Sequence, residues 1–320
     1  VFCDITEKLA KIKEIEYLGF HDELTGLGNR RYLEAKLNQF NQEAYLPLAV
    51  IIGDANGLKL INDAFGHFIG DELLRKIAEA IKSVCRSDDH IFRYGGDEFI
   101  VLLPNTSETE AEKISKRIHQ ACSDIQIGSV KFSMSLGWAV KKSLDDNLME
   151  IITVAENFMY KRKQDDRTDL KGNVVQRIMN ALEMNVEGEK LHSEHVSEMC
   201  EKLAGELNLD TEDREKCKKA GKYHDIGKSI IDKAILDKVG VLNSDEWRMI
   251  KQHSENGYRI LSIDPEYKDI AEYVLQHHER WDGKGYPKGL KGEEIQYISR
   301  IIAICDSYDA MISNRPYHHA

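Results

Sequence analysis

The first half of the chain alternates short apolar runs with amphipathic stretches. Residues 49–54 are apolar and end in an acid, which predicts a buried strand. In residues 71–85 apolar side chains recur every three or four positions, as in an amphipathic helix. Residues 90–103 form two apolar arms around a Gly-Gly pair, which predicts a β-hairpin, followed by a strand over 131–140 and a helix over 147–163. Strands that alternate with helices predict an α/β domain.

The pattern changes after a polar stretch. Residues 164–169, followed by Lys171 and Gly172, predict a domain boundary. Beyond it nearly every segment has helical spacing, broken mainly at residues 282–292, so we expect an all-α domain. The expected domains are therefore 21–169 and 170–320. Residues 1–20 precede them, and helical spacing over 7–20 fits either a dimerising connector helix or a helix that packs on its own domain.

Bulk composition narrows the class of protein. The 320 residues suit two ordinary domains, and no apolar run is long enough to cross a bilayer. A net charge of −11 argues against non-specific binding to nucleic acid polymers or anionic lipid, but not against a small phosphorylated ligand. The six cysteines form no Cys-x-x-Cys pair, which predicts reduced thiols in a cytoplasmic protein. Because the chain starts at Val1, we expect it to be part of a longer protein.

Acidic residues at strand ends form a first candidate site. Asp54 ends a predicted strand, and Asp97 and Glu98 follow the Gly-Gly pair. Clustered carboxylates suit a Mg²⁺ ion that also holds triphosphate oxygens, and glycines let a ligand approach the backbone. Each of these residues alone is more often a cap, a turn or a surface residue. Lys59, Lys163 and Arg167 could supply positive charge to the phosphates. Asn62 and Asp71 offer the donors and acceptors that recognise a guanine edge.

The combination carries a family resemblance. Residues 93–99 read RYGGDEF, and residues 20–167 resemble the GGDEF family of diguanylate cyclases. Residues 22–31 (DELTGLGNRR) and 54–71 (DANGLKLINDAFGHFIGD) match two further motifs of that family. The resemblance implies a nucleotide-cyclase-like fold with a central, mostly antiparallel sheet flanked by helices. It also implies a homodimer in which two bound GTP molecules condense to cyclic di-GMP.

The resemblance assigns a role to each matched position. Asp54 and Asp97 would bind Mg²⁺ or Mn²⁺ with the carbonyl of Ala55, and Asp97, with Glu98 beside it, would act on the 3′-hydroxyl. The implied GTP contacts are Gly95 and Gly96 at the turn, Asn62, His67 and Asp71 at guanine, and Lys59, Lys163 and Arg167 at the phosphates. Asp71 favours a product with two guanines. Arg86 and Asp89 match the family's inhibitory RxxD site for cyclic di-GMP, with a helix-end charge pair as the alternative.

A second candidate site lies in the helical half. Imidazoles and carboxylates without thiolates suit Fe, Mn or Ni. A lone helical histidine is more often a core or surface residue, but a His-Asp and a His-His doublet in one helical domain favour a metal site. The residues concerned are His192, His224, Asp225, His253, His277, His278 and Asp306.

Three segments of this half resemble the HD-GYP phosphodiesterases of the HD superfamily. They are 223–228 (YHDIGK), 277–287 (HHERWDGKGYP) and 300–317 (RIIAICDSYDAMISNRPY), and the resemblance covers residues 171–320. It implies that the seven residues hold two metals about 4 Å apart, bridged by Asp225. Lys228 would contact the phosphate, and Gly285, Tyr286 and Pro287 would shape the nucleotide pocket. Arg315 would have a supporting role.

The chain departs from the HD-GYP pattern in three places. Members with three metals carry a Glu four residues before the first His, where this chain has Gly188. Glu187 and Glu189 are expected to point elsewhere, so two metals are predicted. His195 stands where the family often has Arg, and we expect it to support the ligands rather than join them. We also expect the family's last helix to be missing after Tyr317.

The predicted function is the turnover of cyclic di-GMP, with synthesis in one domain and hydrolysis to linear pGpG or GMP in the other. Two alternatives remain open. The GGDEF domain binds GTP only to regulate the phosphodiesterase, or both domains form a non-enzymatic, nucleotide-responsive scaffold. Residues 1–7 (VFCDITE) resemble the end of a PAS sensor domain, so the expected partners are GTP, cyclic di-GMP, a second copy of the chain and an upstream sensor. No membrane contact is expected within this segment.

Overall fold

The structure, a computed structural model, describes residues 17–170, 174–238 and 240–313, with the backbone alone at 60, 131 and 165–170. The contacts divide the chain into two compact units, one drawn mainly from the first half and one mainly from the second. The PAS-like residues 1–7 and most of the predicted connector helix lie in residues 1–16, outside the described residues. Arg315 and Tyr317 lie outside them as well.

The first unit is built on a five-stranded sheet. Only β1 and β3 pair in parallel, and the other neighbours are antiparallel, which confirms the mostly antiparallel sheet. The strand order is β1 (Gly28–Asn29), β3 (His90–Arg93), β4 (Glu98–Leu103), β2 (Leu48–Ala55) and β7 (Met134–Lys141). The predicted hairpin is therefore β3 and β4. A strand is present where one was predicted over 131–140, but it is β7, which begins only at Met134. The predicted start is wrong, because β6 (Val130–Lys131) pairs with β5 (Gln126–Ile127) in a separate two-stranded sheet.

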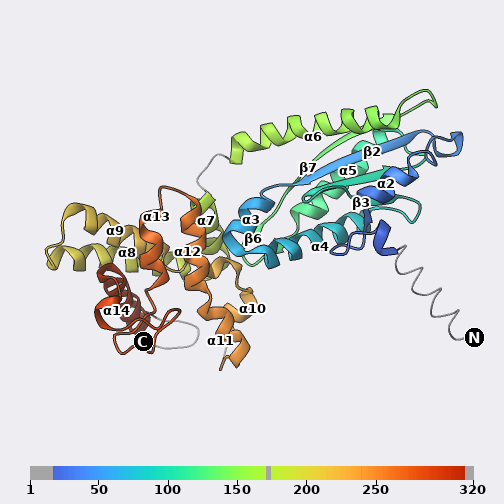
Figure 1. Ribbon diagram of the computed structural model, residues 1–320. Coiled ribbons are helices and arrows are strands. Elements are labelled where there is room, and N and C mark those ends of the chain that lie inside the picture. The colour runs from blue at the N-terminus through green and yellow to red at the C-terminus, as the bar shows by residue number, and fades with distance from the viewer. Residues whose placement is uncertain (1–16, 171–173, 239, 314–320) are drawn as a thin grey trace, which may run out of the picture. The chain divides into compact units, whose positions relative to one another are not determined.

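Helices cover both faces of this sheet, with α6 (Leu148–Leu170) on one side and α4 (His67–Val84) on the other (Figure 1). Helix α6 lies close to β7, because a Cβ at Gly137 would be 2.2 Å from the carbonyl oxygen of Ala155. On the opposite face of β7, Cys122 Sγ of α5 (Glu108–Ser123) lies 3.8 Å from Met134 Sδ. Strand β2 lies between these layers and is buried along its whole length, as its apolar run predicts. The remaining elements of this unit are α2 (Arg30–Lys36) and η1 (Glu43–Tyr45), while most of α3 (Leu58–Phe65) belongs to the second unit, which includes residues 60–67.

Two helix boundaries differ from the sequence prediction. Helix α6 begins near the expected residue but continues to Leu170, through the polar stretch that was predicted to end it. Polarity alone does not stop a helix, because Gln, Arg and Asp are all tolerated in helices and no Gly or Pro intervenes before Leu170. Helix α4 begins at His67, one turn earlier than its apolar periodicity indicates.

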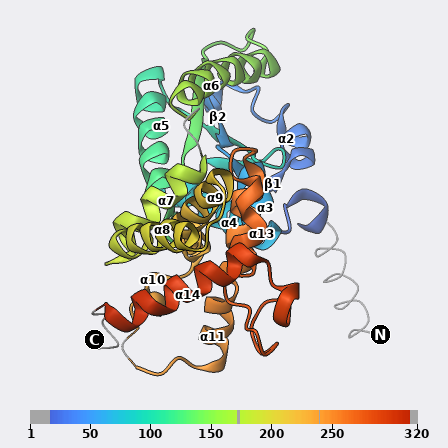
Figure 2. The same cartoon turned by 90° about the vertical axis from the view of Figure 1, so that its left-hand side faces the viewer.

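The second unit is helical, which confirms the all-α prediction. Helices α8 and α9 pack against each other, as do α12 and α13, and α14 contacts both α8 and α9 (Figure 2). Among the described helices, none combines the length and the apolar character that a membrane span requires. The elements are α7 (Val174–Asn185), α8 (Glu189–Glu206), α9 (Thr211–Tyr223), η2 (Ile226–Ile230), α10 (Lys233–Leu236), α11 (Ser244–Lys251), α12 (His253–Ile263), α13 (Lys268–Leu275), η3 (Gly292–Glu294) and α14 (Tyr297–Ile312).

Candidate functional site

The acids of the first candidate site meet where β2 ends beside the β3–β4 hairpin. Asp54 and Glu98 are direct partners in the antiparallel register, so their side chains lie on one face of the sheet. The backbone N–H of Ala55 donates to the carbonyl of Asp97 at 2.9 Å, which holds the hairpin tip against the end of β2. The structure therefore brings together the three predicted metal ligands, Asp54, Ala55 and Asp97, with the predicted catalytic residue Glu98 beside them.

The electrostatics of this edge suit a cation. Asp54 is only 4% exposed, and Nζ of Lys163 on α6 lies 2.5 Å from its Oδ1. Burial raises the pKa of Glu98, and the negative charges of Asp54 and Asp97 raise it further. Carboxylates that resist being charged together favour a divalent cation among them. Lys163, expected at the phosphates, balances the charge of Asp54 in this structure.

The Gly-Gly turn is held in place by an ion pair that the sequence motifs do not reveal. Arg93 donates to the carbonyl of Gly96 at 2.7 Å and pairs with Asp22 at 3.1 Å. Burial alone would raise the pKa of Asp22, but hydrogen bonds from Thr25 and Arg93 outweigh it and lower the pKa. Asp22 therefore fixes the position of the signature turn through Arg93.

The other residues predicted for the first candidate site lie on α3, α4 and the turn after α4. Lys59 and Asn62 belong to α3, while His67 and Asp71 are one turn apart at the start of α4 and share a face of that helix. Lys59 and His67 are exposed. The side chain of Arg167 lies outside the described residues.

Arg86 and Asp89 form a turn of their own between α4 and β3. The Asp89 carboxylate accepts the backbone N–H of Arg86 at 2.6 Å, and the Arg86 side chain is exposed. The turn precedes β3, whereas the Gly-Gly pair follows that strand. A ligand at this turn would therefore lie at the opposite end of β3 from the signature.

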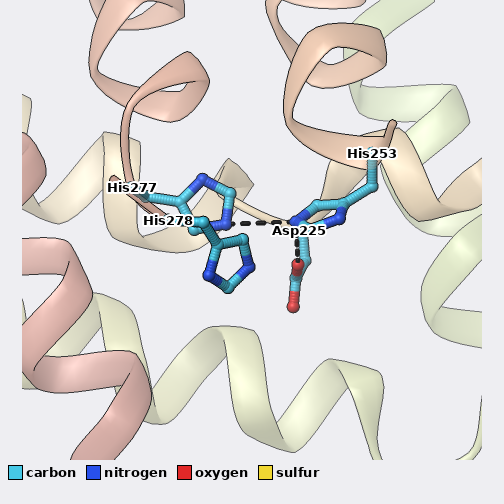
Figure 3. Close-up of side chains that lie close together, drawn as sticks. All are labelled: Asp225, His253, His277 and His278. Atoms are coloured by element: carbon cyan, nitrogen blue, oxygen red, sulfur yellow. Dashed lines mark hydrogen bonds and ion pairs between the residues drawn. The ribbon is translucent and has the colours of Figure 1, made fainter. Parts of the chain in front are cut away.

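The seven histidines and aspartates of the second candidate site converge in the helical unit. They form two groups, and within each group the candidate ligand atoms all lie within 4.8 Å of one another. Figure 3 shows the first group, with the rings of His253 and His277 meeting through their nitrogens and the Asp225 carboxylate directed at His253. The groups are Asp225, His253, His277 and His278, and His192, His224 and Asp306.

Asp225 lies between the two groups. Its Oδ1 is 3.3 Å from His253 Nε2, and its Oδ2 is 3.2 Å from His224 Nε2. His192 Nε2 lies 3.5 Å from the same Oδ2. One carboxylate thus offers an oxygen to each group, the geometry that a bridging ligand of two cations needs.

Hydrogen bonds on the outer side of the rings set the tautomer of the histidines. His224, His253 and His277 each donate Nδ1–H to the backbone carbonyl three residues earlier, at 2.7, 2.6 and 2.5 Å. The proton on Nδ1 leaves the lone pair of Nε2 directed into the cluster, as a metal ligand requires. This donor set fits a metal without any change of side-chain orientation.

His192 uses a different outer partner. It lies inside α8, where the backbone carbonyls are occupied by helix hydrogen bonds, and its Nδ1 lies 2.6 Å from Oδ2 of Asp309. Asp309 is 1% exposed, and sequence reasoning assigned it no role. The available signal is its spacing of three residues from Asp306, which puts both on one face of α14. His195 Nδ1 lies 3.3 Å from the other oxygen of Asp309, rather than in either cluster.

Burial and neighbouring charges shift the pKa values within the cluster in opposite directions. Burial lowers the pKa of His253 and, with His253 beside it, the pKa of His278 to about 3. Burial alone would also lower the pKa of His192, but Asp225 and Asp306 raise it to about 10. Burial opposes ionisation of Asp225, yet Lys228 holds its pKa well below the usual range. The ionised carboxylates and the neutral imidazoles of His253, His277 and His278 match the preferences of Fe, Mn or Ni.

Lys228 and Glu189 occupy the edge of this centre. Lys228 Nζ lies 2.5 Å from Asp225 Oδ2 and 3.4 Å from Glu189 Oε2. The expectation that Glu189 points away is wrong, because α8 begins at Glu189 and places it three residues before His192 on the same face. Gly188, with a φ of 80°, is outside the helix. Glu189 Oε1 is buried and has no hydrogen-bond partner among the described residues.

A cavity of about 360 Å³ opens beside the cluster, lined by His277, His278 and Asp306 on one side. Its rim includes Gly285 and Tyr286 of the loop before η3, and Pro287 follows them in the chain. A Cβ at Gly285 would lie 2.3 Å from the backbone nitrogen of Arg280, so only glycine fits at this position.

The loop beside the cavity is organised by Glu279, a buried residue that sequence reasoning missed. Its Oε1 accepts the backbone N–H groups of Lys288 at 2.6 Å and Gly289 at 3.1 Å, and its Oε2 accepts that of Leu290 at 2.9 Å. The Tyr286 ring packs on His278 with centroids 4.8 Å apart. The loop is therefore anchored beside the candidate ligands.

Both halves of the chain match known families. Residues 19–169 match the family described as diguanylate cyclase, GGDEF domain, and residues 176–320 match the HD domain family. The coiled coil and GGDEF domain of DgcB from Caulobacter crescentus is 21% identical, with a TM-score of 0.48, over 51% of this chain and 91% of that one.

Each of three curated relatives matches less than half of this chain. A protein of Thermotoga maritima named cyclic di-GMP phosphodiesterase is 44% identical over 39% of this chain and 35% of its own length. The 3′3′-cGAMP-specific phosphodiesterase 3 of Vibrio cholerae is 40% identical over 40% of this chain and 28% of its own. A bifunctional diguanylate cyclase/cyclic di-GMP phosphodiesterase of Pseudomonas aeruginosa is 38% identical over 48% of this chain and 24% of its own. This chain spans about a third or less of the length of these relatives.

Proposed function

This chain joins a diguanylate-cyclase GGDEF domain to an HD domain, and we propose that it both makes and hydrolyses cyclic di-GMP. The observation that carries the hydrolytic half is the bridging position of Asp225 between two groups of candidate ligands. The seven residues of the two groups would hold two metal ions of Fe, Mn or Ni. Bound there, the metals supply Lewis acidity and lower the pKa of water.

The chain's own residues supply binding and orientation at the phosphodiester. Lys228 lies at hydrogen-bond distance from Asp225, where its ammonium can contact a phosphate oxygen of a substrate at the same edge. Tyr286 and Gly285 form the adjacent wall of the cavity. The product would be linear pGpG or GMP.

The cyclase half is supported by the acids that meet at the end of β2. Asp54 and Asp97 would hold Mg²⁺ or Mn²⁺, and Asp97 or Glu98 would take the proton of the attacking 3′-hydroxyl. Each domain offers one such site, so two copies of the chain must face each other to join two GTP molecules. We therefore propose a homodimer, with product inhibition through Arg86 and Asp89.

The organisation of the whole protein follows the same proposal. Residues 21–169 would form the cyclase domain and 170–320 the phosphodiesterase domain, with an upstream PAS-like sensor acting through residues 1–20. A cytoplasmic location suits both nucleotides.

A nucleotide time course tests the proposal. Purified protein is incubated with GTP, Mg²⁺ and Mn²⁺, and products are separated by chromatography. Cyclic di-GMP that rises and then decays to pGpG or GMP is the expected result. The Asp97→Asn variant should abolish the rise and the Asp225→Asn variant the decay, so each serves as the control for the other.

Other outcomes select the alternatives. If GTP is untouched while added cyclic di-GMP is cleaved, the GGDEF domain is a regulator. If neither nucleotide changes and the protein retains no metal, the chain is a scaffold. An Arg86→Ala variant with unchanged sensitivity to cyclic di-GMP would remove the inhibitory site from the proposal.

A further inference from the structure

One wall of the cavity beside the metal cluster comes from α11, which carries no predicted site residue. Trp247 and Lys251 line the cavity together with His277, His278 and Asp306. They are four residues apart on α11, so their side chains lie on the same face of the helix. The part of the wall that α11 supplies is therefore made of an indole and an ammonium group.

Lys251 lies between two aromatic rings from different segments. Its Nζ is 5.6 Å from the ring centroid of Trp247 and 5.4 Å from that of Tyr286. Both distances are within the range of cation–π attraction, which holds the ammonium at the cavity. Among the described residues, no carboxylate lies within ion-pair distance of Lys251 Nζ. Arg280, another cation at the cavity, is by contrast paired with Asp282 at 2.8 Å.

Trp247 is not needed to fill the core. It is 46% exposed, and α11 is held by other contacts. Asn243 and Glu246 form a capping box at the start of the helix, and Lys238 pairs with Glu246 at 2.6 Å. A large aromatic side chain that is half exposed on a cavity wall offers a flat face to a planar ligand.

We propose that Trp247 and Lys251 form a subsite for the dinucleotide, in which the indole stacks on a nucleobase and the ammonium pairs with a phosphate. The subsite rests on the proposed phosphodiesterase function. Its position next to His277, His278 and Asp306 puts the held nucleotide beside the phosphodiester to be cleaved. Stacking on an aromatic ring tolerates any base, so Trp247 strengthens the binding of cyclic di-GMP and of 3′3′-cGAMP alike.

Steady-state hydrolysis by the full chain loaded with Mn²⁺ gives the first test. The Trp247→Ala variant should raise the KM for cyclic di-GMP roughly 5- to 100-fold, the loss expected for one stacked base, with little change in kcat. Trp247→Phe should recover most of the affinity. Lys251→Gln should raise KM and reduce its dependence on salt.

Matched controls come from the same helix. Met249 is 49% exposed and Arg248 has a side chain 72% exposed, and neither lines the cavity. Met249→Ala and Arg248→Gln should leave KM unchanged. If Trp247→Ala also leaves KM unchanged while the enzyme cleaves cyclic di-GMP, the subsite is disproved and the proposed function stands.

Fluorescence tests binding without turnover. Replacing Trp138 and Trp281 by Phe leaves Trp247 as the single tryptophan of the chain. Cyclic di-GMP added in EDTA should then change its emission in a saturable way, and a Lys251→Gln substitution in this background should weaken the response. If the Trp247 emission changes but the protein cleaves no cyclic di-GMP, the subsite is supported and the proposed hydrolytic function is wrong. Unchanged emission overturns the subsite.

Discussion

His192 Nδ1 and Asp309 Oδ2 lie 2.6 Å apart and join α8 to α14 in the helical unit. The bond directs Nε2 of His192 at Asp306 Oδ1, 3.4 Å away, and at His224 Nε2, 3.2 Å away. His224, His253 and His277 instead donate Nδ1–H to backbone carbonyls, which a side-chain substitution cannot remove. Asp309 is thus the outer partner of the cluster most open to a mutational test.

Asp309→Ala should weaken metal binding, because His192 loses the group that fixes its orientation and its tautomer. The expected loss of Mn²⁺ affinity is about 10- to 100-fold, measured by competition with a chelating dye. Hydrolysis should recover at saturating Mn²⁺. Asp309→Asn keeps a hydrogen-bond acceptor without the charge, so its Mn²⁺ affinity should lie between those of the unchanged protein and Asp309→Ala. His195→Gln is the control, since this half-exposed ring lies 3.3 Å from the other oxygen of Asp309 and belongs to neither group of candidate ligands. Unchanged affinity in Asp309→Ala would remove its positioning role.

Asp225→Asn should disable both metal groups at once, because each group uses one oxygen of this carboxylate. We expect the rate of hydrolysis to fall by more than about 100-fold, which exceeds the usual loss when a residue hydrogen-bonded to a metal ligand is replaced. The amount of bound metal should also drop after dialysis against EDTA. Synthesis of cyclic di-GMP should continue. Asp232→Asn, at the N-cap of α10 where Asn caps equally well, should retain its metal. A full metal complement in Asp225→Asn would contradict the bridging position.

Asp22→Asn should destabilise the cyclase domain in a pH-dependent way. The pKa of Asp22 in the folded protein lies below its unfolded value of 3.8, so its contribution is present above that pH and is lost as the pH falls through the folded pKa. The variant should lose about 1 to 2 kcal/mol at neutral pH, and the difference should shrink towards about pH 3. Urea unfolding at both pH values measures this. Asp88→Asn, an exposed acid, should show no such trend, and a constant difference would exclude the ion pair as its cause.

Lys141→Met should destabilise the same domain at any pH. Lys141 is 0% exposed, and its Nζ donates to the carbonyl oxygens of Ser143 at 2.6 Å, Leu144 at 3.2 Å and Asp146. Met fills the space but leaves the carbonyls of this loop without their donor, at a cost of about 2 to 4 kcal/mol. Lys142→Met is the control, because that side chain is 68% exposed and pairs with Glu108 at the surface. Equal unfolding midpoints for the two variants would show that the loop finds other donors.

Local sequence pattern was sufficient to predict strand β2 and the β3–β4 hairpin. The continuous apolar run of β2 and the two arms around Gly95–Gly96 each specify one structure, because burial on both faces or a tight turn leaves few alternatives. The same reasoning did not separate β6 from β7, and it ended α6 at residue 163 instead of Leu170. The pairing of β6 with β5 depends on which strands meet in the fold, and no Gly or Pro interrupts α6 before Leu170.

The amino-acid sequence by itself determined two domains, their fold classes and the residue types of both candidate sites, because motif spacing and periodicity are properties of the chain. Tertiary structure alone decided which atoms meet. Asp309 reaches His192 across 117 residues, Glu189 turns toward Lys228, and Trp247 comes to the cavity of Tyr286. These relationships depend on how separate helices pack, and packing is set by contacts between distant segments that no local pattern records.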